Sequence, residues 1–325
     1  MREASLRLCA AVALLGLMVA PAVAQQPAWP KRAITLVVPF QAGGSADIIA
    51  RATADHISAA LGQPIVVDNR GGAGGNVAAA SVAKAPPDGY TIFFGSTGPA
   101  ATSVLMYKNL SFDPRRDFIP VVLVGKTPVI IVARAGAPVA NLKELIAYAK
   151  ANPGQLTAGF PGNGTLGHIT GVLLSQQAGV DMKHVQYRGG GAIINDLLGG
   201  HIDIGIDALT PYVPQVQDGK LRGLAVAGAA RSKQLPDLPT VAESGLTGFE
   251  ASVWYCLLAP TGVPAEVVAK LNGAANDFLR TAKAQELFGK LGVIPSGGTP
   301  DDLKTFIASE LERWGPVVKA AKIEF

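Results

Sequence analysis

The chain has 325 residues, of which 49 % are hydrophobic and 16 % charged, and its formal net charge at pH 7 is +4. Its Lys and Arg residues are scattered and no aromatic ladder accompanies them, so the charge does not indicate a nucleic-acid-binding protein. Its two cysteines and four histidines lack the spacing of metal ligands, and we expect neither a metal site nor a cofactor.

Residues 1–24 have the three parts of a secretory signal peptide. Two arginines form the basic part, residues 8–20 form an apolar part too short to span a bilayer, and residues 22–24 give a small-x-small cleavage pattern. Cleavage there leaves Cys256 as the one remaining cysteine, which excludes an internal disulfide. We therefore expect an exported, soluble protein of the bacterial periplasm.

The next informative segment is a strand, a glycine turn and a helix. Residues 34–38 are an apolar, β-branched run typical of a strand that is covered on both faces, and Pro39 should end it. Gly43 and Gly44 allow a ligand to approach the backbone closely. A helix that opens at Ser45 directs free N–H groups and its positive dipole end at the turn, so this geometry favours a small anion.

Strand-like and helix-like segments alternate along the rest of the chain, which predicts an α/β fold with parallel sheets. The predicted strands cover residues 65–68, 91–95, 121–125, 129–133, 202–206 and 221–227. The predicted helices cover residues 75–84, 141–151, 165–178 and 192–198, and two long helices begin at Pro264 and Pro300. Asn141 should cap its helix, with Glu144 at capping-box distance.

Four glycine-rich turns follow predicted strands and precede predicted helices, at residues 40–45, 71–76, 161–165 and 187–191. A single turn of this kind often serves only tight packing between a strand and a helix. Ligands of α/β proteins collect at the carboxyl ends of strands, so four such turns indicate a binding crevice.

The first turn can hold a carboxylate with the backbone amides of Ala42, Gly43, Gly44 and Ser45. Charge-assisted amide bonds contribute about 1.5–3 kcal/mol each, so a few of them suffice for micromolar affinity without an Arg. The spacing fits neither dinucleotide nor Walker motifs. Asp47 either caps the helix, orders the loop or accepts from a ligand ammonium group.

The segment Gly162-Asn163-Gly164-Thr165 forms a second turn suited to an anion. Thr165 is a good helix N-cap, and the Asn163 side chain with the amides of Gly164 and Thr165 can reach an acidic group. For His168 a buried, hydrogen-bonded imidazole is favoured over a catalytic role.

Further candidates lie at other strand ends. Ser96 and Thr97 offer two hydroxyls but lack the Gly-x-Ser-x-Gly form of a nucleophile elbow. Tyr187 could pack on a ligand or bridge two lobes, and Asp207 is either a helix cap or a cleft residue. Trp254 could wall the pocket or lie in the core.

Together these segments resemble the Bug family, also called TctC-type, the substrate-binding proteins of tripartite tricarboxylate transporters. The matching segments occur in order over nearly the whole chain after the signal: ITLVVPFQAGGSADIIAR, VVDNRGGAGGNVAAA, APPDGYT, FFGSTG, FDPRRDF, PGNGTLGHITG, YRGGGAIINDLLGGHIDI, LRGLAVAG, RSKQLPDLPTVAESGL and LLAPTGVPAEVVAKLN.

The resemblance implies a two-lobed Venus-flytrap fold of the periplasmic binding proteins (type II-like), with two crossover segments as the hinge. The crossovers are expected near residues 121–126 and 221–227. Residues 25–124 with 227–325 would form a discontinuous first lobe, and residues 125–226 the second.

The resemblance also implies a set of ligand-binding residues, because family members hold a carboxylate between the first glycine loop and the Gly-Asn-Gly-Thr loop. Together with Ser45, the expected ligand-binding residues are Phe40, Ala42, Gly43, Gly44, Asp47, Ser96, Thr97, Asn163, Gly164, Thr165, His168, Tyr187, Gly189 and Asp207. The chain departs from the family pattern at Gln41, Val172 and Gly191, which leaves the ligand's identity open.

The function we predict is capture of a small carboxylate in the periplasm and its delivery to membrane permease subunits by a monomer that is not an enzyme. Two alternatives stay open: an exported hydrolase that uses Ser96 and His168, and a ligand-loaded partner of a sensory receptor. The sequence does not distinguish dicarboxylates, tricarboxylates, aromatic acids and amino acids as ligands.

Overall fold

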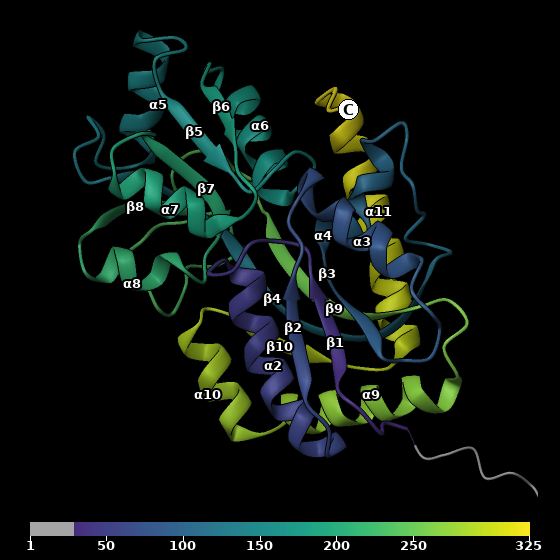
Figure 1. Ribbon diagram of the computed structural model, residues 1–325. Helices are drawn as coiled ribbons and strands as arrows, with labels where there is room; N and C mark the ends of the chain where they lie inside the picture. Colours follow the sequence, from purple (N-terminus) through teal and green to yellow (C-terminus); the bar gives the residue numbers. More distant parts are fainter. Residues whose placement is uncertain (1–28) are drawn as a thin grey trace, which may run out of the picture.

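Two β-sheets that share one long strand organise the protein, whose computed structural model describes residues 29–325 (Figure 1). The shared strand is β4 (Phe118–Arg134). The predicted signal peptide, residues 1–24, lies outside the described residues. The two sheets and their helices form a larger and a smaller lobe, the two-lobed architecture expected from the resemblance.

The sheet of the larger lobe has the strand order β2-β1-β3-β9-β4-β10. Strands β1, β2 and β3 pair in parallel, whereas β9 runs antiparallel to both β3 and β4. The bounds are Ile34–Val38 for β1, Ile65–Asn69 for β2, Thr91–Ser96 for β3, Ser252–Pro260 for β9 and Ile294–Gly297 for β10.

The sheet of the smaller lobe has the order β6-β5-β7-β4-β8. Strands β5, β6 and β7 are parallel to one another, and β7 and β8 are antiparallel to β4. The bounds are Thr157–Phe160 for β5, Lys183–Gln186 for β6, Ile204–Ala208 for β7 and Leu221–Val226 for β8.

Two predictions about the sheets are wrong. The sheets are mixed rather than parallel, because the chain leaves the larger lobe along β4 and returns beside it, in the opposite direction, along β9. Residues 121–125 and 129–133 belong to one strand rather than two. Pro128 lies between the two predicted strands, where β4 changes partners, and its carbonyl accepts from the Leu209 amide at 3.0 Å.

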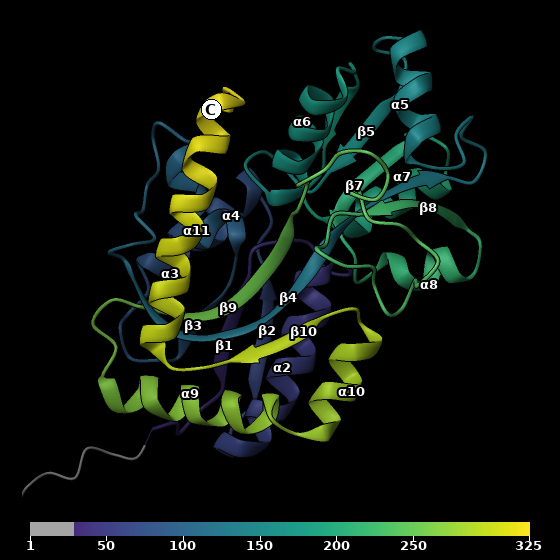
Figure 2. The same cartoon turned by 180° about the vertical axis from the view of Figure 1, so that it is seen from behind.

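Helices cover both faces of each sheet (Figures 1 and 2). In the larger lobe α2 and α9 pack on one face and α3 with α11 on the other; in the smaller lobe α5 and α6 lie opposite α7 and α8. The bounds are Ser45–Leu61 (α2), Asn76–Ala83 (α3), Thr97–Ala100 (α4), Leu142–Ala151 (α5), Leu166–Ala178 (α6), Gly190–Leu198 (α7), Tyr212–Gln217 (α8), Ala265–Leu279 (α9), Ala282–Lys290 (α10) and Pro300–Ala320 (α11).

Most predicted helices are confirmed to within two residues at their ends. The Asn141 side chain accepts from the Glu144 amide at 2.9 Å, which confirms the predicted cap of α5. Strands β5, β6, β9 and β10 were not predicted as such. No helix within residues 29–325 combines the length and the apolar character needed to cross a bilayer.

The two crossings between the lobes meet at three backbone segments. The Ala227 amide donates to the Val129 carbonyl at 2.7 Å, the Val129 amide to Ala251 at 3.0 Å, and the Ala251 amide to Ala227 at 2.6 Å. Strand β4 pairs with β9 up to Pro128 and with β7 from Val129 onwards. The change of partners therefore lies two residues beyond the predicted crossover 121–126.

A buried carboxylate joins α11 to the sheet of the larger lobe. Oε2 of Glu310 accepts from the indole N–H of Trp254 on β9 at 2.9 Å and from that of Trp314 at 3.1 Å. Trp254 is 1 % exposed and belongs to the core rather than to a pocket wall, the second of the two roles considered for it.

Candidate functional site

The four predicted glycine turns all lie between the lobes, two from each side. The β1–α2 and β2–α3 turns belong to the larger lobe, and the β5–α6 and β6–α7 turns to the smaller lobe. Their backbones are so close that a Cβ on Gly44 would lie 3.3 Å from the Gly190 nitrogen, and one on Gly189 would lie 3.1 Å from the Gln41 nitrogen. Glycine is thus required at this interface because two backbones approach each other.

The β1–α2 turn is held by the first turn of its own helix. One oxygen of Asp47 accepts from the Gly43 amide at 2.9 Å, and the other pairs with Arg51 at 2.8 Å. Gly43 has a φ of +86°, a conformation that a residue with a side chain rarely adopts. Asp47 therefore orders the loop, one of the roles considered for it.

The β5–α6 turn is fixed in the same manner. The Thr165 hydroxyl donates to the Gly162 carbonyl at 2.7 Å and accepts from the His168 amide at 3.4 Å, which confirms Thr165 as the N-cap of α6. His168 is 7 % exposed and its ring packs on Phe160 with centroids 4.6 Å apart. Burial and the nearby His184 lower the pKa of His168 to about 4, so its imidazole is neutral.

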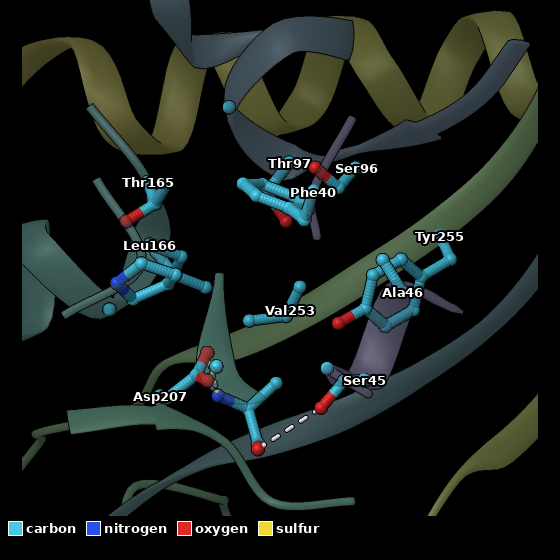
Figure 3. A pocket seen from close by; sticks show the side chains of 16 residues that line it. Phe40, Ser45, Ala46, Ser96, Thr97, Thr165, Leu166, Asp207, Val253 and Tyr255 are labelled. Atoms are coloured by element: carbon cyan, nitrogen blue, oxygen red, sulfur yellow. Dashed lines mark hydrogen bonds between the residues drawn. The ribbon is translucent and has the colours of Figure 1, made fainter. Parts of the chain in front are cut away.

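A cavity of about 30 Å³ lies between the lobes, where these turns meet (Figure 3). This is room for a few water molecules, which suits one carboxylate group. Its lining residues are Phe40, Gly44, Ser45, Ala46, Ser96, Thr97, Gly98, Pro161, Thr165, Leu166, Gly167, Gly190, Asp207, Ala208, Val253 and Tyr255. Both lobes contribute, so the cavity exists only when the lobes are together.

Three helices of at least nine residues begin at this cavity: α2 at Ser45, α6 at Leu166 and α7 at Gly190. Their first-turn amides have no partners within the helix, and each helix dipole places partial positive charge at its N-terminus. Among residues 29–325, no Lys, Arg or His side chain lines the cavity. The positive charge that its wall offers to an anion therefore comes from backbone N–H groups and helix dipoles.

Seven of the fifteen predicted site residues line the cavity. They are Phe40, Gly44, Ser45, Ser96, Thr97, Thr165 and Asp207. The other eight do not: Ala42, Gly43, Asp47, Asn163, Gly164, His168, Tyr187 and Gly189. Most of these eight belong to the glycine turns around the cavity or, like Asp47 and His168, accept hydrogen bonds from backbone amides of those turns.

Asn163 and Tyr187 lie instead in a larger groove of about 550 Å³ at the edge of the interface. Residues 71–74 of the larger lobe and Arg188 of the smaller lobe also line it, and it shares Pro161 with the cavity. The Tyr187 hydroxyl is already engaged, since it donates to Asp196 at 2.6 Å.

The most informative residues missed by the sequence reasoning are Tyr255 and Val253 on β9. Side chains alternate along a strand, so Trp254 faces α11 while its two neighbours face the cavity. After Ser252 the strand has no charged or strongly polar residue, and its pattern gives no sign of which face meets a ligand. The Tyr255 hydroxyl points into the space shared with Asp207 (Figure 3).

Ser96 and His168 do not form a catalytic pair in this arrangement. Nδ1 of His168 accepts from the Gly164 amide at 3.4 Å, and its ring packs against Phe160 and Phe325 rather than against the cavity. No hydrogen bond joins the two side chains in the described residues 29–325.

The lobes are in contact through specific hydrogen bonds. The Ser45 hydroxyl donates to the Ala208 carbonyl at 3.1 Å, the Gln41 amide to Arg188 at 3.1 Å, and the Tyr107 hydroxyl to Asn163 at 2.9 Å. Each bond joins the larger lobe to the smaller one. This is consequently a closed conformation, and entry to the cavity requires these bonds to open.

The Tyr107→Phe substitution should weaken ligand binding about 2- to 10-fold without changing the melting temperature of the free protein. It removes one hydrogen bond that exists only when the lobes are closed, and such a bond contributes about 0.5–1.5 kcal/mol. Titration calorimetry measures the affinity. Tyr148→Phe, on α5 and away from the cleft, is the control; an equal loss in both variants would rule out the role given to Tyr107.

The sequence of this chain matches the family model described as "Tripartite tricarboxylate transporter family receptor", TctC, over residues 49–323. Protein BugT of Bordetella pertussis is 34 % identical over 313 residues, which cover 95 % of this chain and 96 % of BugT.

Solved structures of related proteins share this fold. The Rhodopseudomonas palustris protein Rpa4515, solved with adipate, has a TM-score of 0.89 and 38 % identity, with 91 % of this chain and 99 % of that chain covered. The periplasmic binding protein BugD has a TM-score of 0.88 and 36 % identity at the same coverage. MatC of R. palustris, solved with bound malate, has a TM-score of 0.85 and 34 % identity, with 89 % and 100 % covered.

Proposed function

Since the chain belongs to the TctC family of tripartite tricarboxylate transporter receptors, which includes the Bug proteins, we propose that it captures a small carboxylate between its lobes in the periplasm and delivers it to a membrane permease. The family consists of periplasmic substrate-binding proteins rather than enzymes, so the serine hydrolase alternative loses its support.

The observation that carries this proposal is the convergence of three helix N-termini from two lobes on one small cavity. Within the described part of the chain, the cavity presents backbone N–H groups and no cationic side chain. A ligand carboxylate bound there contacts α2 of the larger lobe and α6 and α7 of the smaller lobe together. It therefore stabilises the closed conformation over the open one, which is what a capture mechanism requires.

The cavity takes one carboxylate group, and the remainder of the ligand extends toward the groove lined by Asn163, Tyr187 and Arg188. Pro161 borders both spaces. In this assignment the predicted residues of the cavity hold the common acidic group, and those of the groove select among ligands. Two related structures, solved with adipate and with malate, agree with an acid of this size.

We further propose that the chain divides into lobes as predicted, with residues 25–124 and 227–325 in one and 125–226 in the other, to within a few residues at each crossing. The partner change of β4 at Pro128 and Val129 and the meeting of Ala227 with Ala251 support this division. The protein would act as an exported monomer, with the signal peptide removed.

A thermal-shift panel of mono-, di- and tricarboxylates that includes adipate and malate tests the proposed ligand class. A ligand at a concentration of about 100 times its Kd should raise the free energy of unfolding by about 2.7 kcal/mol. This increase is readily visible as a higher melting temperature. The diamide of adipate is the matched neutral control and should give no shift. The proposal fails if no acid shifts the transition, or if the diamide does so as strongly as adipate.

A further inference from the structure

One side chain of the cavity carries the same kind of acidic group as the proposed ligand. Asp207 lies on β7, paired with Ile130 of β4, and is 7 % exposed. Its Oδ1 accepts from the Ala208 amide at 2.7 Å, and its Oδ2 is 3.4 Å from the Tyr212 hydroxyl. In Figure 3 its carboxyl group points into the space that Tyr255 also enters.

No cation compensates this carboxyl group. Burial is the main influence on the pKa of Asp207, and no Lys, Arg or His of residues 29–325 lowers that pKa. A buried carboxylate without a cation is expensive to keep ionised. The α7 N-terminus opposes this cost, because Oδ2 lies so close to Gly190 that a Cβ there would be 2.2 Å away.

A second anion in the same cavity makes ionisation of Asp207 harder still. Two carboxylates that share a small buried site repel each other strongly, so one of them retains a proton. The helix N-termini at Ser45, Leu166 and Gly190 favour an anionic ligand, whereas the Asp207 side chain has a neutral form in which it can donate a hydrogen bond.

We infer that Asp207 is a specificity-determining residue that contacts the ligand carboxylate in its protonated form and donates a hydrogen bond to it, so that the bound complex contains one proton more than the ionised protein and ligand. This inference rests on the proposed function. It assigns the ligand class as acids that present a bare carboxylate to the cavity rather than an ammonium group.

The remaining ionisable groups support this assignment. Burial raises the pKa of Asp207 to about 7 and raises the pKa values of Tyr212 and Tyr255, which face it from α8 and β9, above their usual range. Asp47 on α2 is engaged by the Gly43 amide, and His168 on α6, with its pKa lowered to about 4, packs away from the cavity. Asp207 is thus the cavity group that titrates near neutral pH.

Affinity measured by calorimetry between pH 6 and pH 9 tests the inference, with adipate as the probe because both of its carboxyl groups are ionised throughout. Because only the protonated protein binds, the Kd should rise with pH, by up to about tenfold per pH unit where Asp207 of the free protein is ionised. Asp207→Asn cannot ionise but keeps an N–H donor. Its Kd should therefore vary less than about twofold over the same range.

A second measurement does not depend on the variant. Calorimetry of the unaltered protein at pH 8, in buffers of different ionisation enthalpy, should show uptake of nearly one proton per adipate bound. A flat wild-type profile, no proton uptake, or an identical slope in Asp207→Asn would each overturn the inference, as would glutamate binding more tightly than adipate and tightening as pH rises. If no carboxylate binds the wild-type protein at any pH, the proposed function fails too, whereas binding with a flat profile overturns only the role of Asp207.

Discussion

Replacing Gly74 by alanine is expected to weaken carboxylate binding by about 100-fold or more while the protein remains folded. A Cβ at this position would lie 2.0 Å from the carbonyl oxygen of Asn163, which belongs to the opposite lobe. That oxygen is backbone and accepts from Tyr107, so it cannot move aside alone. The lobes must stay apart, and a binding-competent closed state populated at one part in a hundred lowers the affinity by the same factor.

Gly62→Ala is the matched control for this substitution. Gly74 has φ and ψ of 64° and 19°, and Gly62, the C-cap of α2, has 67° and 16°. Alanine in this left-handed conformation costs about 1–2 kcal/mol of stability in either place. A Cβ on Gly62, however, meets nothing within 4 Å. Both variants should therefore melt at a similarly lower temperature, and only Gly74→Ala should lose the ligand-induced shift. Equal ligand affinities in the two variants would show that a side chain at position 74 does not prevent the lobes from closing.

The Glu310→Ala substitution should lower the free energy of unfolding by about 3 kcal/mol. It leaves the buried indole N–H groups of Trp254 and Trp314 without an acceptor, at about 1–3 kcal/mol each, and opens space between α11 and β9. Chemical denaturation measures the loss. The effect reaches the cleft as well, because the Trp254 backbone amide donates to the hydroxyl of Thr97 at 3.1 Å, and Thr97 lines the cavity.

Two variants separate the hydrogen bonds from the charge of Glu310. Glu310→Gln keeps an oxygen that can accept from both indoles, so it should retain most of the stability. Glu312→Ala, on the exposed face of the same helix, should change the free energy of unfolding by less than about 0.5 kcal/mol. A loss in Glu310→Gln as large as in Glu310→Ala would show that the charge of Glu310, which also pairs with Arg313 of the same helix, matters more than its bonds to the indoles.

The sequence predicted the local geometry of the site well. Pro39 ends β1, and Ser45 and Thr165 mark helix starts that face the cavity, because backbone chemistry fixes these features within a few residues. The glycine turns were correctly placed at the ends of strands. These signals are short-range, and their physical causes can be read directly from residue type.

The features that the sequence did not predict depend on contacts between distant segments. Tyr255 faces the cavity only because β9 is paired with β3 and β4 in one register, which a uniformly apolar run does not reveal. Residues 121–125 and 129–133 were predicted as two strands, but they form one continuous strand that changes partners between Pro128 and Val129. Gly74 carried no sign that its neighbour would be the carbonyl of Asn163.

A crystal structure with the acid that gives the largest thermal shift would show how the ligand is held. One ligand carboxylate should lie within hydrogen-bond distance of first-turn amides of both α2 and α6, with the lobes closed and the Asp207 side chain beside it. A ligand held by one lobe alone, or bound outside the cavity that these helices share, would disprove capture between the lobes.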